Sequence, residues 1–122
     1  MKSFYHRLHG GRFHCQVLMQ LERYVIAHGW KLKSIDGFKD KYHCPCEPDI
    51  FFEIYSKKFG KQLYVVEVET KASKKSIQKK WQQYKDSTAG ITDLIILDMS
   101  KLKKQGDWMA IDRFIDDWMP GE

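Results

Sequence analysis

The chain has 122 residues, a formal net charge of +5, a hydrophobic fraction of 43% and an aromatic fraction of 14%. This length corresponds to one domain, 1–122, and the composition is typical of a packed core rather than of a disordered segment. No apolar stretch approaches the roughly 18 residues needed to cross a bilayer, and residues 1–7 contain no apolar signal segment. We therefore expect an intracellular, cytoplasmic protein that does not enter a membrane.

The three cysteines, Cys15, Cys44 and Cys46, are too few and too unevenly placed for a disulfide framework. A reducing compartment fits this usage best. The segment 43–46, His-Cys-Pro-Cys, invites a zinc interpretation, but it lacks the second pair of ligands that structural zinc sites use. The preferred interpretation is a loop bent by proline that carries two small hydrophobic residues.

The first half of the chain predicts one helix and one short strand. Residues 14–28 form the helix, with Gly29 as its C-terminal stop. Its apolar residues recur at helical spacing: Val17, Leu18, Leu21 and Val25. Residues 30–35 predict a strand, and residues 36–47 predict a loop.

The middle of the chain predicts a hairpin followed by a second helix. Residues 50–55 and 62–70 form the two strands, joined by 56–61, where Gly60 can adopt a positive φ. Ser73 is a suitable N-cap for a helix over 74–87. An inward apolar stripe and the stop Gly90 complete this helix; the stripe comprises Ile77, Trp81, Tyr84 and Thr88.

The last predicted elements are a buried strand over 91–98 and an amphipathic C-terminal helix over 107–119. The complete order is α-β-β-β-α-β with an extra C-terminal helix. This order predicts an α/β fold with a mixed central sheet flanked by helices.

Acidic residues gather at the end of the predicted hairpin. Alternation along a strand places Glu67, Glu69 and Lys71 on one face, and pairing with the neighbouring strand brings Asp49 beside them. Crowded carboxylates repel one another unless a cation binds them, and Mg²⁺ or Mn²⁺ favours such ionised oxygens. The pattern therefore predicts a divalent metal site suited to phosphodiester hydrolysis.

These residues resemble the motif of the PD-(D/E)XK nuclease superfamily, which includes restriction endonucleases and archaeal Holliday-junction resolvases. The matching residues are Pro48-Asp49 and Glu69-Thr70-Lys71, and Lys71 lies 22 positions after Asp49 (71 − 49). The resemblance implies a restriction-endonuclease-like fold and a Mg²⁺-dependent DNA endonuclease, and its resolvase members suggest selectivity for junctions or branched DNA. It also implies a homodimer, as in the resolvases.

Two registers of the motif are open. In the first, Glu69 is the metal-binding acid, Lys71 the lysine, and the carbonyl of Thr70 a further metal ligand. In the second, Glu67 is the acid, Glu69 stands in the place of the lysine, and the carbonyl of Val68 contacts the metal. Asp49 and Glu69 take part in both, and the first register is preferred because it retains a cation.

Members of this superfamily often contribute a carboxylate from the first helix, and Glu22 is the one acid between residues 14 and 28. The resemblance therefore adds Glu22 to the metal ligands. A surface ion pair with Arg23 is the alternative, and His14 could occupy a comparable place one or two turns earlier.

Nucleic-acid contacts are expected from the second helix and the N-terminal arm. Residues 71–85 contain six lysines and no acid, which predicts a surface that meets anions. The arm, 1–12, adds Arg7 and Arg12, with a frayed terminus as the alternative. The contacts predicted on the helix are Lys74, Lys75, Gln78, Lys79, Gln82 and Lys85.

Alternative functions are a non-catalytic nucleic-acid-binding domain of the same fold, or a nuclease subunit of a larger restriction or transposition assembly. A homodimer is predicted because the C-terminal helix carries more large apolar residues than a small sheet needs. These residues are Trp108, Met109, Ile111, Phe114, Ile115, Trp118 and Met119.

Overall fold

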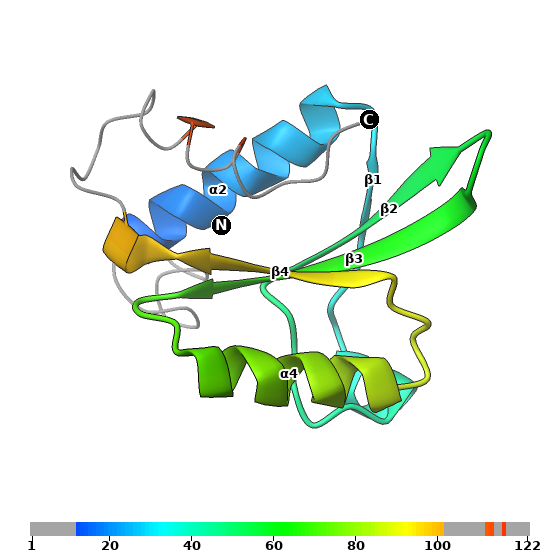
Figure 1. Ribbon diagram of the computed structural model, residues 1–122. Helices are drawn as coiled ribbons and strands as arrows, with labels where there is room; N and C mark the ends of the chain where they lie inside the picture. The colour runs from blue at the N-terminus through cyan, green and yellow to red at the C-terminus, as the bar shows by residue number, and fades with distance from the viewer. Residues whose placement is uncertain (1–11, 102–111, 114–115, 117–122) are drawn as a thin grey trace.

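The computed structural model describes residues 12–101 together with 112, 113 and 116 (Figure 1). It is an α/β structure built on one four-stranded sheet. In chain order its elements are helix α2 (Arg12–Ala27), strand β1 (Lys31–Lys33), helix α3 (Phe38–Tyr42), strands β2 (Ile50–Ser56) and β3 (Gly60–Glu69), helix α4 (Lys74–Asp86), strand β4 (Asp93–Asp98) and the 3₁₀ turn η1 (Met99–Lys101).

The sheet is mixed and open, with strand order β1-β2-β3-β4. Strands β1, β2 and β3 pair antiparallel, with Ile50 opposite Val66, whereas β4 lies parallel to β3 with Asp98 beside Glu69. Helix α4 makes the crossover that a parallel pair requires. This register places residues 67–69, residue 98 and the start of β2 at one end of the sheet.

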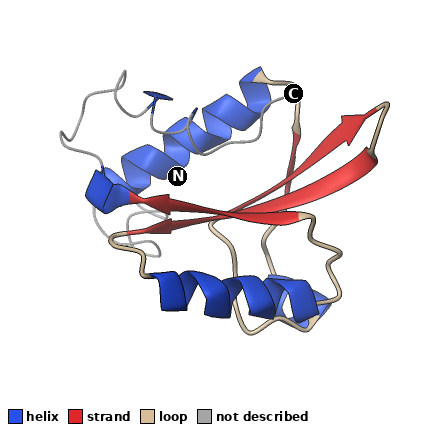
Figure 2. Cartoon of the chain, in the orientation of Figure 1, coloured by secondary structure: helices blue, strands red, loops and turns tan. Residues whose placement is uncertain are grey.

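Helices cover both faces of the sheet, α2 on one side and α3 with α4 on the other (Figure 2). On the α2 side, Leu18 and Leu21 pack with Phe52 and Val66. Alternation along β2 turns Phe51 to the opposite side, where it belongs to a second apolar cluster that includes Phe38, Val65 and Tyr84. Two separate apolar clusters therefore hold the sheet between the helices.

The helix ends predicted from Gly29, Ser73 and Gly90 can be compared with the structure. Gly29 takes a left-handed φ of 74° and donates its N–H to Ile26 O at 3.0 Å, which confirms the end of α2. Ser73 caps α4 by accepting from Ser76 N, which is also confirmed. Helix α4, however, ends at Asp86 with Ser87 as its C-cap, so assigning the stop to Gly90 was wrong. Thr88 lies beyond the helix and is exposed.

The predicted order α-β-β-β-α-β is confirmed, with one short helix added. Helix α3 lies in the predicted loop 36–47, where Gly37 adopts a left-handed φ of 66° and Phe38 inserts into the core. Of the helix predicted over 107–119, only Asp112, Arg113 and Asp116 are described, all of them helical, and the other residues lie outside the described part. The arm 1–11 also lies outside it.

Within residues 12–101 and the three later positions, no helix combines the length and the apolarity needed to cross a membrane.

Candidate functional site

The ends of β3 and β4 lie close to the N-terminal turns of α4 (Figure 1), and β2 begins opposite the last part of β3. Acidic residues occupy these positions: Asp49, Glu67, Glu69 and Asp98. Asp49 lies one residue before β2, after the buried Pro48. Its N–H donates to Val66 O at 2.9 Å, and its carboxylate Oδ2 accepts from Val68 N at 2.7 Å. Asp49 is thus fixed to the strand segment that carries Glu67 and Glu69, as the hairpin register predicted.

Glu67 is a buried carboxylate, 7% exposed, on the face of the sheet that α4 covers. The hydroxyl of Tyr84 donates to its Oε2 at 2.6 Å, and the ammonium of Lys80 lies 3.5 Å from its Oε1. Burial raises the pKa of Glu67 from 4.5 to about 7, and the charges of Asp49 and Glu69 add to this rise. The hydrogen bond from Tyr84 and the charge of Lys80 act in the opposite direction.

Lys80 bridges the two glutamates. Its Nζ donates a hydrogen bond to Glu69 Oε1 and pairs with Glu67 on the other side. Burial alone would lower the pKa of Lys80, but the hydrogen bond to Glu69 and the charges of both glutamates outweigh it, so the pKa is raised. The ammonium therefore stays charged and holds two carboxylates together at the end of β3.

Lys80 and Tyr84 were not predicted as site residues. They are four residues apart on α4, so they lie on one helix face, and that face is directed at Glu67. Burial raises the pKa of Tyr84, as does the neighbouring Glu67, so its phenol remains a hydrogen-bond donor. One signal could have identified Lys80: it lies between Ile77 and Tyr84 on the inward stripe, where a lysine needs an anionic partner.

The predicted lysine, Lys71, is exposed after the end of β3. The cation that contacts Glu67 and Glu69 comes from α4 instead, six positions after Lys74. The preference for the first register rested on its retained cation. Lys80 supplies a cation in either register, so that reason no longer distinguishes them.

Helix α2 contributes His14 rather than Glu22 to this end of the sheet. His14 Nε2 lies 3.9 Å from Asp49 Oδ2. Glu22 is partly buried on the same helix, but eight residues further along, which corresponds to about 12 Å. The structure thus places Asp49, Glu67 and Glu69 at the same end of the sheet, whereas Glu22 lies about two turns further along α2 than His14.

Asp98 is a further acid that sequence reasoning did not single out. It is 7% exposed at the end of β4, directly beside Glu69 in the parallel register. Its Oδ1 accepts from the backbone N–H of Ser100 at 3.0 Å and from the Ser100 hydroxyl at 2.6 Å. These bonds orient the carboxylate at the beginning of η1.

The two cysteines before Asp49 pack against α4. The thiol of Cys46 donates to Gln83 Oε1 at 2.6 Å, and Cys44 is 4% exposed. Burial, followed by the neighbouring Cys44 and Glu67, raises the pKa of Cys46 to about 11. Both cysteines therefore pack against α4 as small side chains.

The outward face of α4 is basic, as the charge pattern predicted. The six residues of this helix expected to contact nucleic acid are all exposed: Lys74, Lys75, Gln78, Lys79, Gln82 and Lys85. Gln82 also donates to Asp86 at 2.9 Å. Arg7 lies outside the described residues; Arg12 begins α2, and its side chain is not described.

The donor chemistry suits a hard divalent cation, because the carboxylate oxygens of Asp49, Glu67 and Glu69 are the ligands that Mg²⁺ and Mn²⁺ prefer. In the described part of the chain, no three His, Cys, Asp or Glu side chains are gathered closely enough to enclose an ion. Lys80 is the positive charge between the two glutamates in this structure. Metal binding would therefore require this ammonium to share or give up its carboxylate partners.

Comparisons with protein-family models, with curated proteins and with solved structures found no match to this chain.

Proposed function

We propose that this protein is a metal-dependent endonuclease that hydrolyses phosphodiester bonds in DNA. The observation that carries the proposal is the cluster of Asp49, Glu67 and Glu69 at one end of the sheet, with Lys80 beside the two glutamates. Carboxylates and an ammonium in this arrangement are the groups that phosphodiester hydrolysis uses. The resemblance to the PD-(D/E)XK motif leads to the same chemistry independently of Lys80.

The sheet supports a restriction-endonuclease-like fold. Apart from the short helix α3, the three antiparallel strands followed by a helix and a parallel fourth strand are in line with the α-β-β-β-α-β order that the resemblance implies. The acids lie at the end of β3, next to the crossover helix α4. The two parts of the motif, Pro48-Asp49 and Glu69-Thr70-Lys71, therefore meet at the same end of the sheet.

Asp49, Glu67 and Glu69 would hold Mg²⁺ or Mn²⁺. When bound, such an ion lowers the pKa of coordinated water and neutralises charge on the phosphate. The Asp49 carboxylate is oriented by Val68 N, and Glu67 is oriented by the Tyr84 hydroxyl. If a substrate phosphate took the place of Glu69 as the partner of Lys80, the ammonium would stabilise the negative charge that develops on that phosphate.

The basic face of α4 would bind the DNA backbone. Lys75, Lys79 and Lys85 are exposed there, whereas Lys80 points to the acids from the same helix. One helix would therefore bind phosphates on its outer side and contribute to the reaction on its inner side.

A non-catalytic DNA-binding domain is the second candidate, favoured by one observation. Lys80 already pairs with both glutamates, and such an ion-pair network can be structural on its own. In that case the basic face of α4 would bind DNA and the acids would only hold α4 on the sheet. The role as a subunit of a larger restriction or transposition assembly stays open in either case.

Incubation with linear, single-stranded, flapped and four-way-branched DNA, each with Mg²⁺, Mn²⁺ or EDTA, tests the proposal. We expect strand cleavage with either metal and none with EDTA, with the branched substrates cut fastest. Binding without cleavage of any substrate in the presence of both metals would favour the non-catalytic domain.

A further inference from the structure

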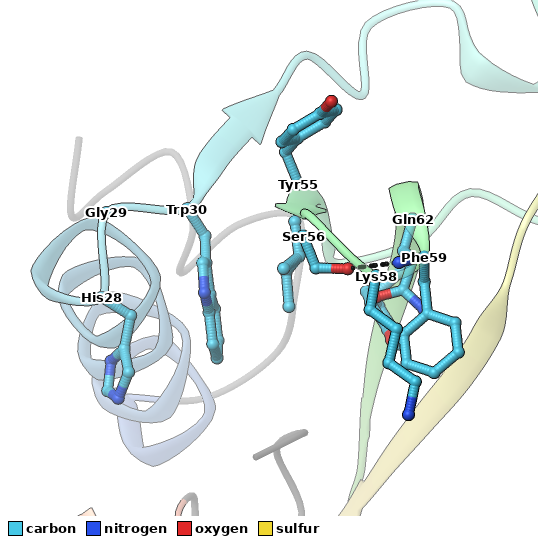
Figure 3. A pocket seen from close by; sticks show the side chains of 10 residues that line it. His28, Gly29, Trp30, Tyr55, Ser56, Lys58, Phe59 and Gln62 are labelled. Atoms are coloured by element: carbon cyan, nitrogen blue, oxygen red, sulfur yellow. Dashed lines mark hydrogen bonds between the residues drawn. The ribbon is translucent and has the colours of Figure 1, made fainter. Parts of the chain in front are cut away.

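A second feature lies at the opposite end of the sheet, where β2 and β3 extend into a hairpin (Figure 1). A pocket of about 670 Å³ opens between this hairpin and the end of α2. Figure 3 shows His28 and Trp30 on one side of it and Lys58, Phe59 and Gln62 on the other. Pockets of this size are typical of sites for small molecules or single nucleotides.

The pocket is aromatic on both sides. Trp30 stacks on Phe52 with a centroid separation of 5.4 Å, and the ring of His28 lies 4.7 Å from that of Trp30. On the hairpin side, Phe59 is 66% exposed, an unusual position for a large apolar ring. A planar ligand could therefore contact an exposed ring on one side and the edge of a rigid aromatic stack on the other.

The hairpin turn adds positive charge to these rings. Lys57 and Lys58 are both exposed, and Lys58 Nζ lies 5.1 Å from the centroid of the Phe59 ring. Lys61 follows, but Glu53 pairs with it at 3.7 Å, so its charge is partly compensated. The turn therefore presents an aromatic ring with the Lys58 ammonium beside it and a second exposed lysine, Lys57, earlier in the same turn. Aromatic rings and positive charges are the combination that recognises a base and its phosphate.

We propose that the hairpin and this pocket bind an unpaired nucleotide of DNA. The base would stack on Phe59, and Lys57 and Lys58 would contact the adjacent phosphates. Paired bases are already stacked within the duplex, so the pocket would select bulges, flaps and branch points over intact duplex.

This inference deepens the proposed function, on which it rests for the choice of DNA as the partner. The pocket is remote from the acids, because Gly60 and Glu67 are seven residues apart along β3, which corresponds to about 23 Å. Substitutions in the turn should therefore alter substrate choice without disturbing Asp49, Glu67 or Glu69.

Fluorescence anisotropy with labelled DNA in EDTA tests the inference without cleavage. The probes are a blunt duplex, the same duplex with one unpaired nucleotide, and an RNA duplex with the same bulge. The variants are Phe59→Ala and Lys58→Ala. Lys41→Ala is the matched control, because Lys41 Nζ lies 5.3 Å from the Tyr42 ring on α3 in the same kind of cation–π contact.

We expect the wild-type protein to bind the bulged DNA more tightly than the duplex. Phe59→Ala should weaken binding to the bulged DNA about tenfold, while its binding to the duplex changes less than about twofold. Lys41→Ala should preserve the preference. Equal affinity of wild-type protein for bulged and intact duplex, or an unchanged preference in Phe59→Ala, would overturn the inference, as would tighter binding to the RNA.

Cleavage distinguishes this inference from the proposed function. Selective binding that depends on Phe59, in a protein that cuts no DNA, would support the pocket and refute the nuclease. Cleavage of all substrates at rates that Phe59→Ala leaves unchanged would refute the pocket alone. Self-association that Phe59→Ala abolishes, without any effect on DNA binding, would assign this surface to a second copy of the chain.

Discussion

Glu67 illustrates how one buried carboxylate can depend on the few groups around it. A carboxylate at this depth needs hydrogen-bond donors, and it receives them from Tyr84 at 2.6 Å and from the nearby ammonium of Lys80. These partners do not fully compensate for burial, because the pKa of Glu67 remains raised to about 7. The residue is thus poised between its charged and neutral forms close to neutral pH.

The pH dependence of stability follows from that pKa. Because the folded-state pKa lies above the ordinary value of 4.5, this group contributes stability that is complete below pH 4.5 and is lost as pH rises through 7. In EDTA, we expect the free energy of unfolding of the wild type to fall by roughly 3 kcal/mol relative to Glu67→Gln over that window. Urea unfolding at a series of pH values measures it, and a difference that does not vary with pH would contradict the assignment.

We predict different effects on the cleavage rate for substitutions of Lys80 and of Lys71. Because Lys80 contacts Glu67 and Glu69 whereas Lys71 is exposed beyond β3, we expect Lys80→Met to lower the cleavage rate at least about 100-fold. Lys71→Met should remain within about threefold of the wild type. Single-turnover cleavage with saturating protein measures both, and circular dichroism confirms that each variant folds. A severe defect in Lys71→Met with a mild one in Lys80→Met would return the role to Lys71.

At the scale of elements, α4 presents two faces of different character. Its inner face carries Lys80, Trp81 and Tyr84 toward the sheet, and its outer face presents Lys75 and Lys79 to solvent. This division follows from helical periodicity, since residues three or four apart share a face. The basic outer face can therefore be altered without touching the acids.

Neutralising Lys75, Lys79 and Lys85 together should weaken binding to all DNA sequences about equally. Each lost phosphate contact reduces the slope of log K against log salt by about 0.9, so three contacts flatten it by up to about 2.7. Anisotropy titrations at several salt concentrations measure the slope. The control neutralises an equal number of exposed lysines elsewhere, at positions 31, 39 and 41. Equal losses in both triple variants would mean that binding depends on net charge and not on α4.

Most elements were predictable from the sequence because their patterns are long or have clear ends. Helix α2 has a regular apolar stripe and a glycine stop, and α4 has its cap at Ser73. Helix α3 was missed because a five-residue helix has room for only one apolar pair, Phe38 and Tyr42. Its position depends on the pocket that Phe38 fills, which is a property of the whole fold.

The same limit applies to the candidate site. Asp49, Glu67 and Glu69 could be grouped from strand alternation and hairpin register, which are local rules. The partners on α4 depend on how that helix crosses the sheet, and no local pattern specifies this crossing. Lys80 was therefore counted among the lysines of a basic segment, and its pairing with two buried or half-buried carboxylates emerged only in three dimensions.

At the scale of the whole molecule, the chain combines a net charge of +5 with a buried acidic cluster. The basic side chains of α4 and of the hairpin turn lie on the outside, whereas Glu67 and Asp98 are enclosed at one end of the sheet. We expect the basic side chains to attract a polyanion, and the acids to repel it unless a metal ion binds them.

The homodimer is also a prediction at this scale. It rests on the large apolar residues of 107–119, all seven of which lie outside the described part of the chain. Sedimentation equilibrium at micromolar concentration should give twice the chain mass of 14.5 kDa. A single species of 14.5 kDa would refute the dimer and would make a nicking activity more suitable than paired cuts.

The most direct measurement is the Mg²⁺-dependent cleavage rate of Asp49→Asn and Glu69→Gln beside that of Glu53→Gln. Glu53 is an acid of the same hairpin that pairs with Lys33 and Lys61, away from the cluster, and so controls for the loss of one charge. We predict that both cluster variants lose cleavage by a factor of at least about 1,000 while their DNA affinity is retained, and that Glu53→Gln cuts like the wild type. Cleavage by either cluster variant at a rate near that of the wild type would contradict the assignment of the active site.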